Sequence, residues 1–116
     1  MPQTVYRVVS HNPPSESDYL TYAELGLKIR NPTPESLRWA TGYSTLNSLQ
    51  EARIRANGKP WLGHAYIGVY LLLENENFVI EQTGTNLVHY TVWCSSDFLR
   101  ACLVEVVDIE EDSDNV

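Results

Sequence analysis

The sequence predicts one α+β domain, in which short helices of the N-terminal half pack on a mainly antiparallel sheet. The chain has 116 residues, 43% hydrophobic and 20% charged, which is the size and composition of one globular domain. Helix-start signals fall between residues 15 and 58, whereas apolar β-branched segments dominate from residue 65 to residue 109. A run of helices followed by a run of strands is typical of α+β architecture.

The first part of the chain is expected to hold a strand and a short helix. Residues 4–9 (TVYRVV) are mostly β-branched and aromatic, which predicts a strand. The HNPPS segment that follows is rich in turn-forming residues and ends this strand. Ser15, with Asp18 three residues later, predicts a short helix that ends at Gly26.

Two further helices are predicted on either side of a short strand. Thr33-Pro34-Glu35 combines an N-cap threonine, a proline at the first helical position and an acid in the first turn, so a helix is expected from there to a point near Gly42. Residues 43–46 predict a short strand. Ser48 and Glu51 form a capping box, which predicts a helix up to residue 58.

The C-terminal half predicts four strands, over residues 65–73, 78–83, 87–93 and 102–109. The first two are joined by the polar turn ENEN and are expected to form a hairpin. In the third, alternation places His89 and Thr91 on one face. Residues 1–109 are therefore expected to form one domain, with the acidic residues 110–116 as a flexible tail.

Charge is distributed unevenly along the chain. The net charge is −7 and acids crowd the C-terminal end, whereas six of the eight basic residues lie between residues 28 and 59. The composition is not globally basic, so we expect no nucleic-acid partner. The basic middle allows a local phosphate or pyrophosphate site, and the acidic tail allows a protein partner.

Several other function classes lack their sequence signals. The histidines and cysteines show neither the paired spacing of a metal site nor a CxxC motif; they are His11, His64, His89, Cys94 and Cys102. No apolar segment approaches the roughly 20 residues that cross a bilayer. The N-terminus lacks the basic and apolar regions of a signal peptide. We therefore expect a cytoplasmic protein with no metal and no membrane contact.

Arg7 and the stretch Tyr43-Ser44-Thr45 are the leading candidate ligand-binding residues. An arginine in so apolar a strand either holds a ligand phosphate or ribose with its guanidinium, or lies on the solvent face of an edge strand, or pairs with a carboxylate. The hydroxyl of Ser44 or Thr45 either contacts a ligand while the Tyr43 ring stacks on it, or these residues alternate along an ordinary strand.

Two carboxylates and one histidine complete the candidate set. Glu81 lies where a strand runs into a glycine turn, and Glu105 is embedded in the last apolar strand. Each is either a functional carboxylate that stabilises developing positive charge or a solvent-facing strand residue. His89 either lines the site or is a satisfied core group.

These residues resemble the ADP-ribosyltransferase-like superfamily, in particular its small bacterial members. Arg7 in VYRVV is similar to the arginine or histidine that holds NAD on an early strand of that family. Gly42-Tyr43-Ser44-Thr45, with Ala52 in the following helix, is similar to the family's aromatic and hydroxyl pattern. The resemblance implies an ADP-ribosyltransferase-like fold with NAD as the bound nucleotide.

The resemblance also implies roles for the candidate residues. Catalytic roles fall to Arg7, Ser44, Thr45 and the late-strand carboxylate, either Glu81 or Glu105. Cofactor binding falls to Arg7, Tyr43 and His89. Neither an E-x-E nor a Q-x-E pair lies within the late strands, where it would single out one carboxylate; the E-x-E of Glu74-Asn75-Glu76 belongs to the polar turn ENEN.

Two functions are expected from these features. The first is NAD-dependent transfer of ADP-ribose or cleavage of NAD. The second is a non-catalytic interaction module, such as an acidic immunity or inhibitor protein. A homodimer is also compatible with the sequence. NAD should raise the melting temperature under the first, whereas salt should weaken binding to a basic partner under the second.

Overall fold

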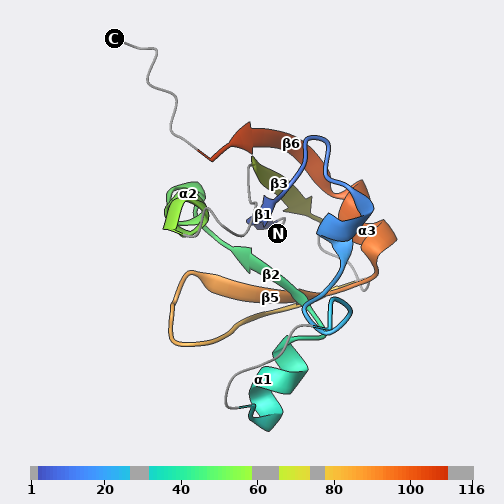
Figure 1. The fold of residues 1–116 in the computed structure, drawn as a ribbon, viewed down its shortest axis with the longest axis vertical. Helices are drawn as coiled ribbons and strands as arrows, with labels where there is room; N and C mark the ends of the chain where they lie inside the picture. The colour runs from blue at the N-terminus through green and yellow to red at the C-terminus, as the bar shows by residue number, and fades with distance from the viewer. Residues whose placement is uncertain (1–2, 27–31, 59–65, 74–77, 110–116) are drawn as a thin grey trace.

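The computed structural model describes residues 3–26, 32–58, 66–73 and 78–109, which form an α+β domain (Figure 1). The elements in chain order are β1 (Gln3–Val9), the 3-10 turn η1 (Glu16–Tyr19), α1 (Pro34–Trp39), β2 (Tyr43–Leu46), α2 (Leu49–Gly58), β3 (Tyr66–Leu72), β4 (Val79–Gln82), β5 (His89–Trp93), α3 (Ser96–Ala101) and β6 (Leu103–Asp108). The predicted α+β class with a mainly antiparallel sheet is confirmed. The expected tail, residues 110–116, lies outside the described residues.

The strands form one antiparallel sheet in the order β4-β5-β2-β1-β3-β6. β1 pairs with β3 from Gln3 to Val9, but it meets β2 at one residue pair, Tyr6 and Leu46. We call this pair the β1–β2 joint. In Figure 1, β3 and β6 lie above β1, and β2 and β5 lie below it. The sheet therefore consists of two three-stranded halves that meet at the joint.

The predicted hairpin of residues 65–73 and 78–83 is wrong. β3 lies between β1 and β6, whereas β4 pairs with β5 at the far edge of the other half. The physical reason lies in burial. Ile67, Val69 and Tyr70, successive side chains on both faces of β3, are almost fully covered, and such a strand needs a neighbour on each side. β4 has mostly exposed residues, as an edge strand allows.

The predicted helix from Ser15 to Gly26 is much shorter in the structure. Its helical part is η1, and an irregular turn follows. At this turn the Thr21 hydroxyl accepts from the Glu24 N–H at 3.2 Å, and the Glu24 carboxylate accepts from the Thr21 N–H at 2.9 Å. These local side-chain bonds offer the backbone an alternative to the helical ladder. Gly26 adopts φ +69°, which ends the turn in the left-handed region.

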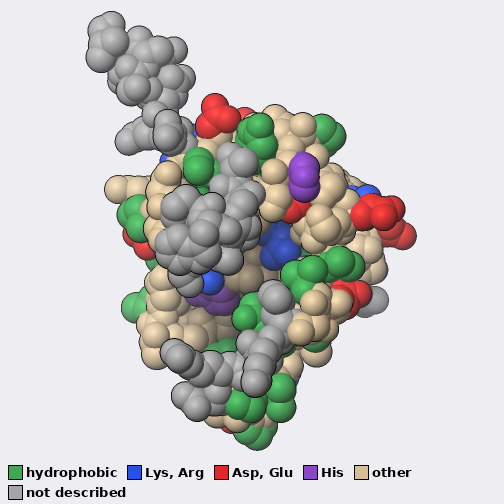
Figure 2. All heavy atoms as spheres, viewed as in Figure 1, with side chains coloured by type: hydrophobic (Ala, Val, Ile, Leu, Met, Phe, Trp, Pro, Cys, Tyr) green, Lys and Arg blue, Asp and Glu red, His purple; other side chains and the backbone are tan. Residues whose placement is uncertain are grey.

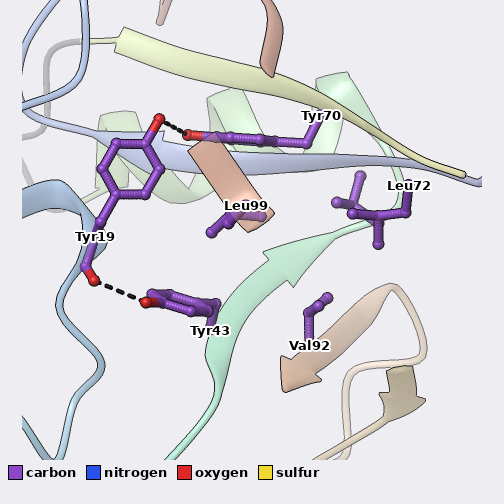
Figure 3. Close-up of a cluster of buried hydrophobic side chains, with 7 residues drawn as sticks. Tyr19, Tyr43, Tyr70, Leu72, Val92 and Leu99 are labelled. Carbon is purple, nitrogen blue, oxygen red and sulfur yellow. Dashed lines mark hydrogen bonds between the residues drawn. The ribbon is translucent and has the colours of Figure 1, made fainter. Parts of the chain in front are cut away.

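Helices cover both faces of the sheet. α2 packs on one face, where Ala52 and Ala56 are fully buried and Ala52 contacts Leu46 and Ile67. The small alanine side chains let this helix lie close to the strands. η1 and α3 cover the opposite face, whose core is shown in Figure 3 and consists of Val5, Tyr19, Tyr43, Tyr70, Leu72, Val92 and Leu99.

Three tyrosines tie η1 to the sheet within that core. The Tyr43 hydroxyl donates to the Tyr19 carbonyl oxygen at 2.8 Å, and the Tyr70 hydroxyl donates to the Tyr19 hydroxyl at 3.1 Å (Figure 3). The rings of Tyr19 and Tyr70 meet edge to face. Buried hydroxyls are thus satisfied within the core. Among the described residues, no helix is long and apolar enough to cross a membrane.

Candidate functional site

Arg7 lies on β1 next to the β1–β2 joint and reaches across to β2. Its Nη1 donates to the Ser44 carbonyl oxygen at 2.8 Å. Its Nε and Nη2 both donate to the Asp18 carbonyl oxygen, at 3.3 and 3.2 Å, and its guanidinium lies 5.1 Å from the centre of the Tyr43 ring. β1 is a central strand, so the alternative of an edge-strand arginine is wrong. The guanidinium instead bonds to backbone where the two strands have separated.

The positive charge of Arg7 is stabilised by backbone carbonyl groups and by the Tyr43 ring. Burial lowers the pKa of Arg7, and the neighbouring tyrosines and Asp18 act in the opposite direction. An arginine stays protonated at neutral pH despite such a shift. Arg7 bonds to the backbone oxygen of Asp18 and not to its carboxylate. The carboxylate instead accepts from the Ser10 and Ser15 N–H groups at 2.8 and 2.9 Å. Arg7 therefore brings positive charge to the joint.

Ser44 belongs to a chain of hydrogen-bonded polar side chains on the α2 face. Its Oγ lies 2.6 Å from Nε2 of His89, and Nδ1 of His89 lies 2.9 Å from the Thr83 hydroxyl. The Thr83 hydroxyl lies 2.8 Å from the Thr91 hydroxyl. Strand register explains the arrangement, because Ser44 is opposite Thr91 in the β2–β5 pair. The predicted shared face of His89 and Thr91 is confirmed. Thr83 was missed, since nothing in its turn sequence marks it as a partner of His89.

His89 is neutral in this chain at neutral pH. Burial lowers its pKa below the usual 6.5, the positive charge of Arg55 on α2 lowers it further, and a hydrogen bond to the Thr83 backbone acts in the opposite direction. The Thr83 and Ser44 hydroxyls, which contact Nδ1 and Nε2 of His89, can each donate or accept a hydrogen bond. In the tautomer with the proton on Nδ1, Nδ1 donates to the Thr83 hydroxyl, and Nε2 can accept the Ser44 hydroxyl proton.

The guanidinium of Arg7 and the hydroxyls of Ser44 and Thr45, all candidate ligand-binding groups, do not converge on one side of the sheet. The Arg7 side chain leaves β1 on the η1 and α3 face, as Val5 does, whereas the Ser44 hydroxyl is on the α2 face, as Leu46 is. Arg7 meets the Ser44 backbone and not its hydroxyl. Thr45 is 1% exposed, and its hydroxyl donates to the Tyr90 carbonyl at 3.0 Å.

Tyr43 is part of the core and does not present a free ring. It is 3% exposed, its hydroxyl is bonded to Tyr19, and the guanidinium of Arg7 lies over its ring. The expected stacking of this ring on a ligand stays a prediction, and the ring would have to be uncovered for it. Its role is to hold Arg7 by a cation–π contact.

The two candidate carboxylates lie at different distances from the joint. Glu81 on β4 is opposite Thr91, which is opposite Ser44, so all three share one row across the sheet. Glu105 lies on the edge strand β6, opposite Val69, with β3 between it and β1. Glu81 is thus the closer carboxylate to Ser44.

Glu81 already has a partner at the surface. Arg38 of α1 donates to its two carboxylate oxygens at 3.0 and 2.9 Å, and this bidentate bond lowers the pKa of Glu81. The Arg38 guanidinium also lies 4.2 Å from the centre of the Trp93 ring. Both charged side chains are half exposed, so a ligand can replace either partner.

The face around the joint is hollowed. Figure 2 shows a basic side chain at the floor of a hollow over β1 and a histidine side chain over β2 and β5. A separate shallow groove of about 310 Å³ lies beside Tyr43, and Cys94 lines it. Burial raises the pKa of Cys94 to about 11, so its thiol is protonated and is not a nucleophile at neutral pH.

Comparison with known proteins adds no assignment. No family model, curated protein or solved structure matches this chain. In the part of the chain that the structure describes, no group of three or more His, Cys, Asp or Glu side chains is placed to hold a metal ion. Any functional conclusion therefore rests on the geometry at the joint.

Proposed function

We propose that this chain is an NAD-binding protein of the ADP-ribosyltransferase-like kind, which transfers ADP-ribose or cleaves NAD at the β1–β2 joint. One observation carries the proposal: Arg7, on the first strand, meets Ser44, on the strand that leads into α2, where the two strands separate. The resemblance in sequence assigns NAD to these two residues. The α+β architecture with its antiparallel sheet is compatible with it.

The residues at the joint fit the chemistry of a dinucleotide. A guanidinium has more N–H donors than the bonds of Arg7 to backbone carbonyls use, and the planar group suits a phosphate. The exposed Ser44 hydroxyl and the His89 ring suit ribose hydroxyls. Arg7 and the Ser44 hydroxyl leave opposite faces of the sheet, so NAD would have to contact these two groups from different sides of the β1–β2 joint.

A carboxylate is the remaining requirement of this chemistry. Breaking the bond between nicotinamide and ribose builds positive charge on the sugar, and a nearby carboxylate stabilises it. We assign this role to Glu81 rather than Glu105, because Glu81 shares the row of Ser44 and Thr91. Arg38 would have to release Glu81 when NAD is bound.

Thermal unfolding with and without NAD tests the proposal. NAD at about 100 times its Kd should stabilise the fold by about 2.7 kcal/mol, which corresponds to a rise in Tm on the order of 10 °C for a domain of this size. Ser44→Ala should reduce the rise, while the matched control Thr4→Ala, an exposed β1 hydroxyl opposite Leu71, should keep it. Glu81→Gln should keep NAD binding but abolish nicotinamide release.

Absence of any Tm rise for the unmodified chain at millimolar NAD would overturn the proposal. The alternative is then the interaction module. That function predicts binding to a basic protein that weakens steeply as salt is raised.

A further inference from the structure

We propose that Ser44 and His89 form a nucleophile and general-base pair that cleaves small acyl esters. This activity uses the two side chains that we also assign to the ribose hydroxyls of NAD, but it does not require NAD. The Ser44 Oγ lies 2.6 Å from His89 Nε2, within the range expected of such a pair. Ser44 is exposed, so an ester can reach its hydroxyl, while His89 is half-buried and held from behind.

The pair is fixed by regular structure. Ser44 and His89 come from β2 and β5, which pair antiparallel over four residues, so their separation is set by the sheet. On the far side of the ring, Nδ1 contacts the Thr83 hydroxyl, which contacts the Thr91 hydroxyl. Thr83 is thus a positioning residue that orients the imidazole, as a third group does in other nucleophile–base pairs.

The protonation state of the pair suits attack by serine. With the proton of His89 on Nδ1, Nε2 accepts from the Ser44 hydroxyl and can take its proton. The charged groups near His89 are Arg55 on α2 and, across β5, Glu81 on β4, whose charge is matched by Arg38. Arg55 disfavours the protonated ring. The base is therefore ready at neutral pH.

Ester hydrolysis at this pair needs only Ser44, His89 and water. Ser44 Oγ forms a bond to the ester carbonyl carbon as its proton moves to Nε2 of His89. The bond from carbonyl carbon to alkoxy oxygen breaks, and the alcohol leaves with the proton from His89. Water, deprotonated by His89, then attacks the acyl-serine and releases the carboxylic acid and the free Ser44 hydroxyl.

A second serine–histidine contact in the same chain, Ser15 with His11, serves as a comparison for Ser44 and His89. Ser15 and His11 also touch, with Ser15 Oγ 3.1 Å from Nδ1, but the Asp18 carboxylate lies 3.4 Å from the same nitrogen. One ring nitrogen faces both serine and carboxylate, so it cannot serve as a free base for Ser15. Both serines have a histidine neighbour, although Ser15 is half-buried and Ser44 is exposed. Only the geometry at Ser44 predicts reactivity.

A serine-reactive fluorophosphonate probe with peptide mass spectrometry tests the proposal. Ser44 Oγ should bond to phosphorus with loss of fluoride, and the adduct should map to Ser44 and not to Ser15. Ser44→Ala should abolish labelling, and His89→Gln should slow it about 10²-fold or more. Ser15→Ala should label at the unmodified rate. Hydrolysis of p-nitrophenyl acetate should follow the same order.

The positioning role of Thr83 is tested by the labelling rates of two Thr83 variants. Thr83→Val should slow labelling, and Thr83→Ser, which restores the hydroxyl, should recover it. The labelling rate should be level at neutral pH and fall on acidification below the usual histidine range, since the pKa of His89 is lowered. An unlabelled Ser44, or equal rates for the unmodified chain and a folded His89→Gln variant, would overturn the proposal. The NAD thermal shift is independent of either result.

Discussion

Replacement of Arg7 by methionine should destabilise the fold, because its guanidinium bonds to backbone on two other segments. Methionine keeps much of the length of the side chain but removes its charge and its donors. The Asp18 carbonyl then loses both of its bonds from Arg7, which are partly buried, and Tyr43 loses its cation–π contact. The Ser44 carbonyl is exposed and can bond to water instead.

The size of the effect follows from these contacts. The two Arg7 bonds reach one carbonyl oxygen of Asp18, so we count them together as one hydrogen bond to a charged donor, which contributes about 1.5–3 kcal/mol. A cation–π contact adds about 0.5–1 kcal/mol. We give no stabilising contribution to the exposed bond with Ser44. The free energy of unfolding should therefore fall by about 2–4 kcal/mol in Arg7→Met.

Urea unfolding followed by tryptophan fluorescence and far-UV circular dichroism measures this change. Arg7→Lys should lose most of the same stability, because an ammonium cannot hold both carbonyls with one planar fork. If Arg7→Met unfolds within about 0.5 kcal/mol of the unmodified chain, Arg7 is not structural. Our account of the joint would then need revision, because the bonds of Arg7 to the Asp18 carbonyl would contribute little to stability. Ser44→Ala is the cleaner test of ligand binding for this reason.

Three further predictions concern the core and its response to pH. In Gly68→Ala, the new Cβ would lie 2.8 Å from the buried Tyr70 ring, so urea unfolding should show a loss of about 1–3 kcal/mol; an unchanged midpoint would contradict this packing. Tyr70→Phe removes the hydroxyl bond to Tyr19 and should cost about 1–2 kcal/mol in calorimetry, without change in the sheet signal; equal stability would mean that water replaces it. Burial alone would raise the pKa of Asp18, but its backbone hydrogen bonds lower it below 3.8, so stability is full above that pH and is lost as pH falls through the lower folded value. Asp18→Asn should flatten this acid dependence in a pH series of melting curves, and an unchanged slope would exclude Asp18 as its source.

Local signals predicted most elements, because they act within a few residues. The predicted cap at Thr33 is formed, because its hydroxyl accepts from the Ser36 N–H at 3.0 Å. The alanine face of α2 is buried as its spacing indicates. The failed hairpin shows the limit of such signals, since strand partners are chosen by contacts distant in the sequence. β3 is covered on both faces and so takes a central place, which its spacing from β4 does not reveal.

The candidate site was predicted in part for the same reason. Alternation correctly placed His89 with Thr91 and set Ser44 apart from its neighbours. The sequence did not reveal that Arg7 would use its donors on the backbone of η1, because that contact depends on how the turn after β1 folds back. Nor did it reveal Thr83 behind His89, since β4 had been paired with the wrong strand.

The single pair at the β1–β2 joint gives the domain a natural hinge. Each half of the sheet has its own ladders, while Tyr6 and Leu46 alone join their backbones in the paired strands. α2 packs against β1, β2 and β3 and therefore contacts both halves of the sheet. Small rotations of the two halves about this joint would change the separation of Arg7 and Ser44, and NMR relaxation dispersion on the β1 and β2 amides would detect them on the microsecond to millisecond scale.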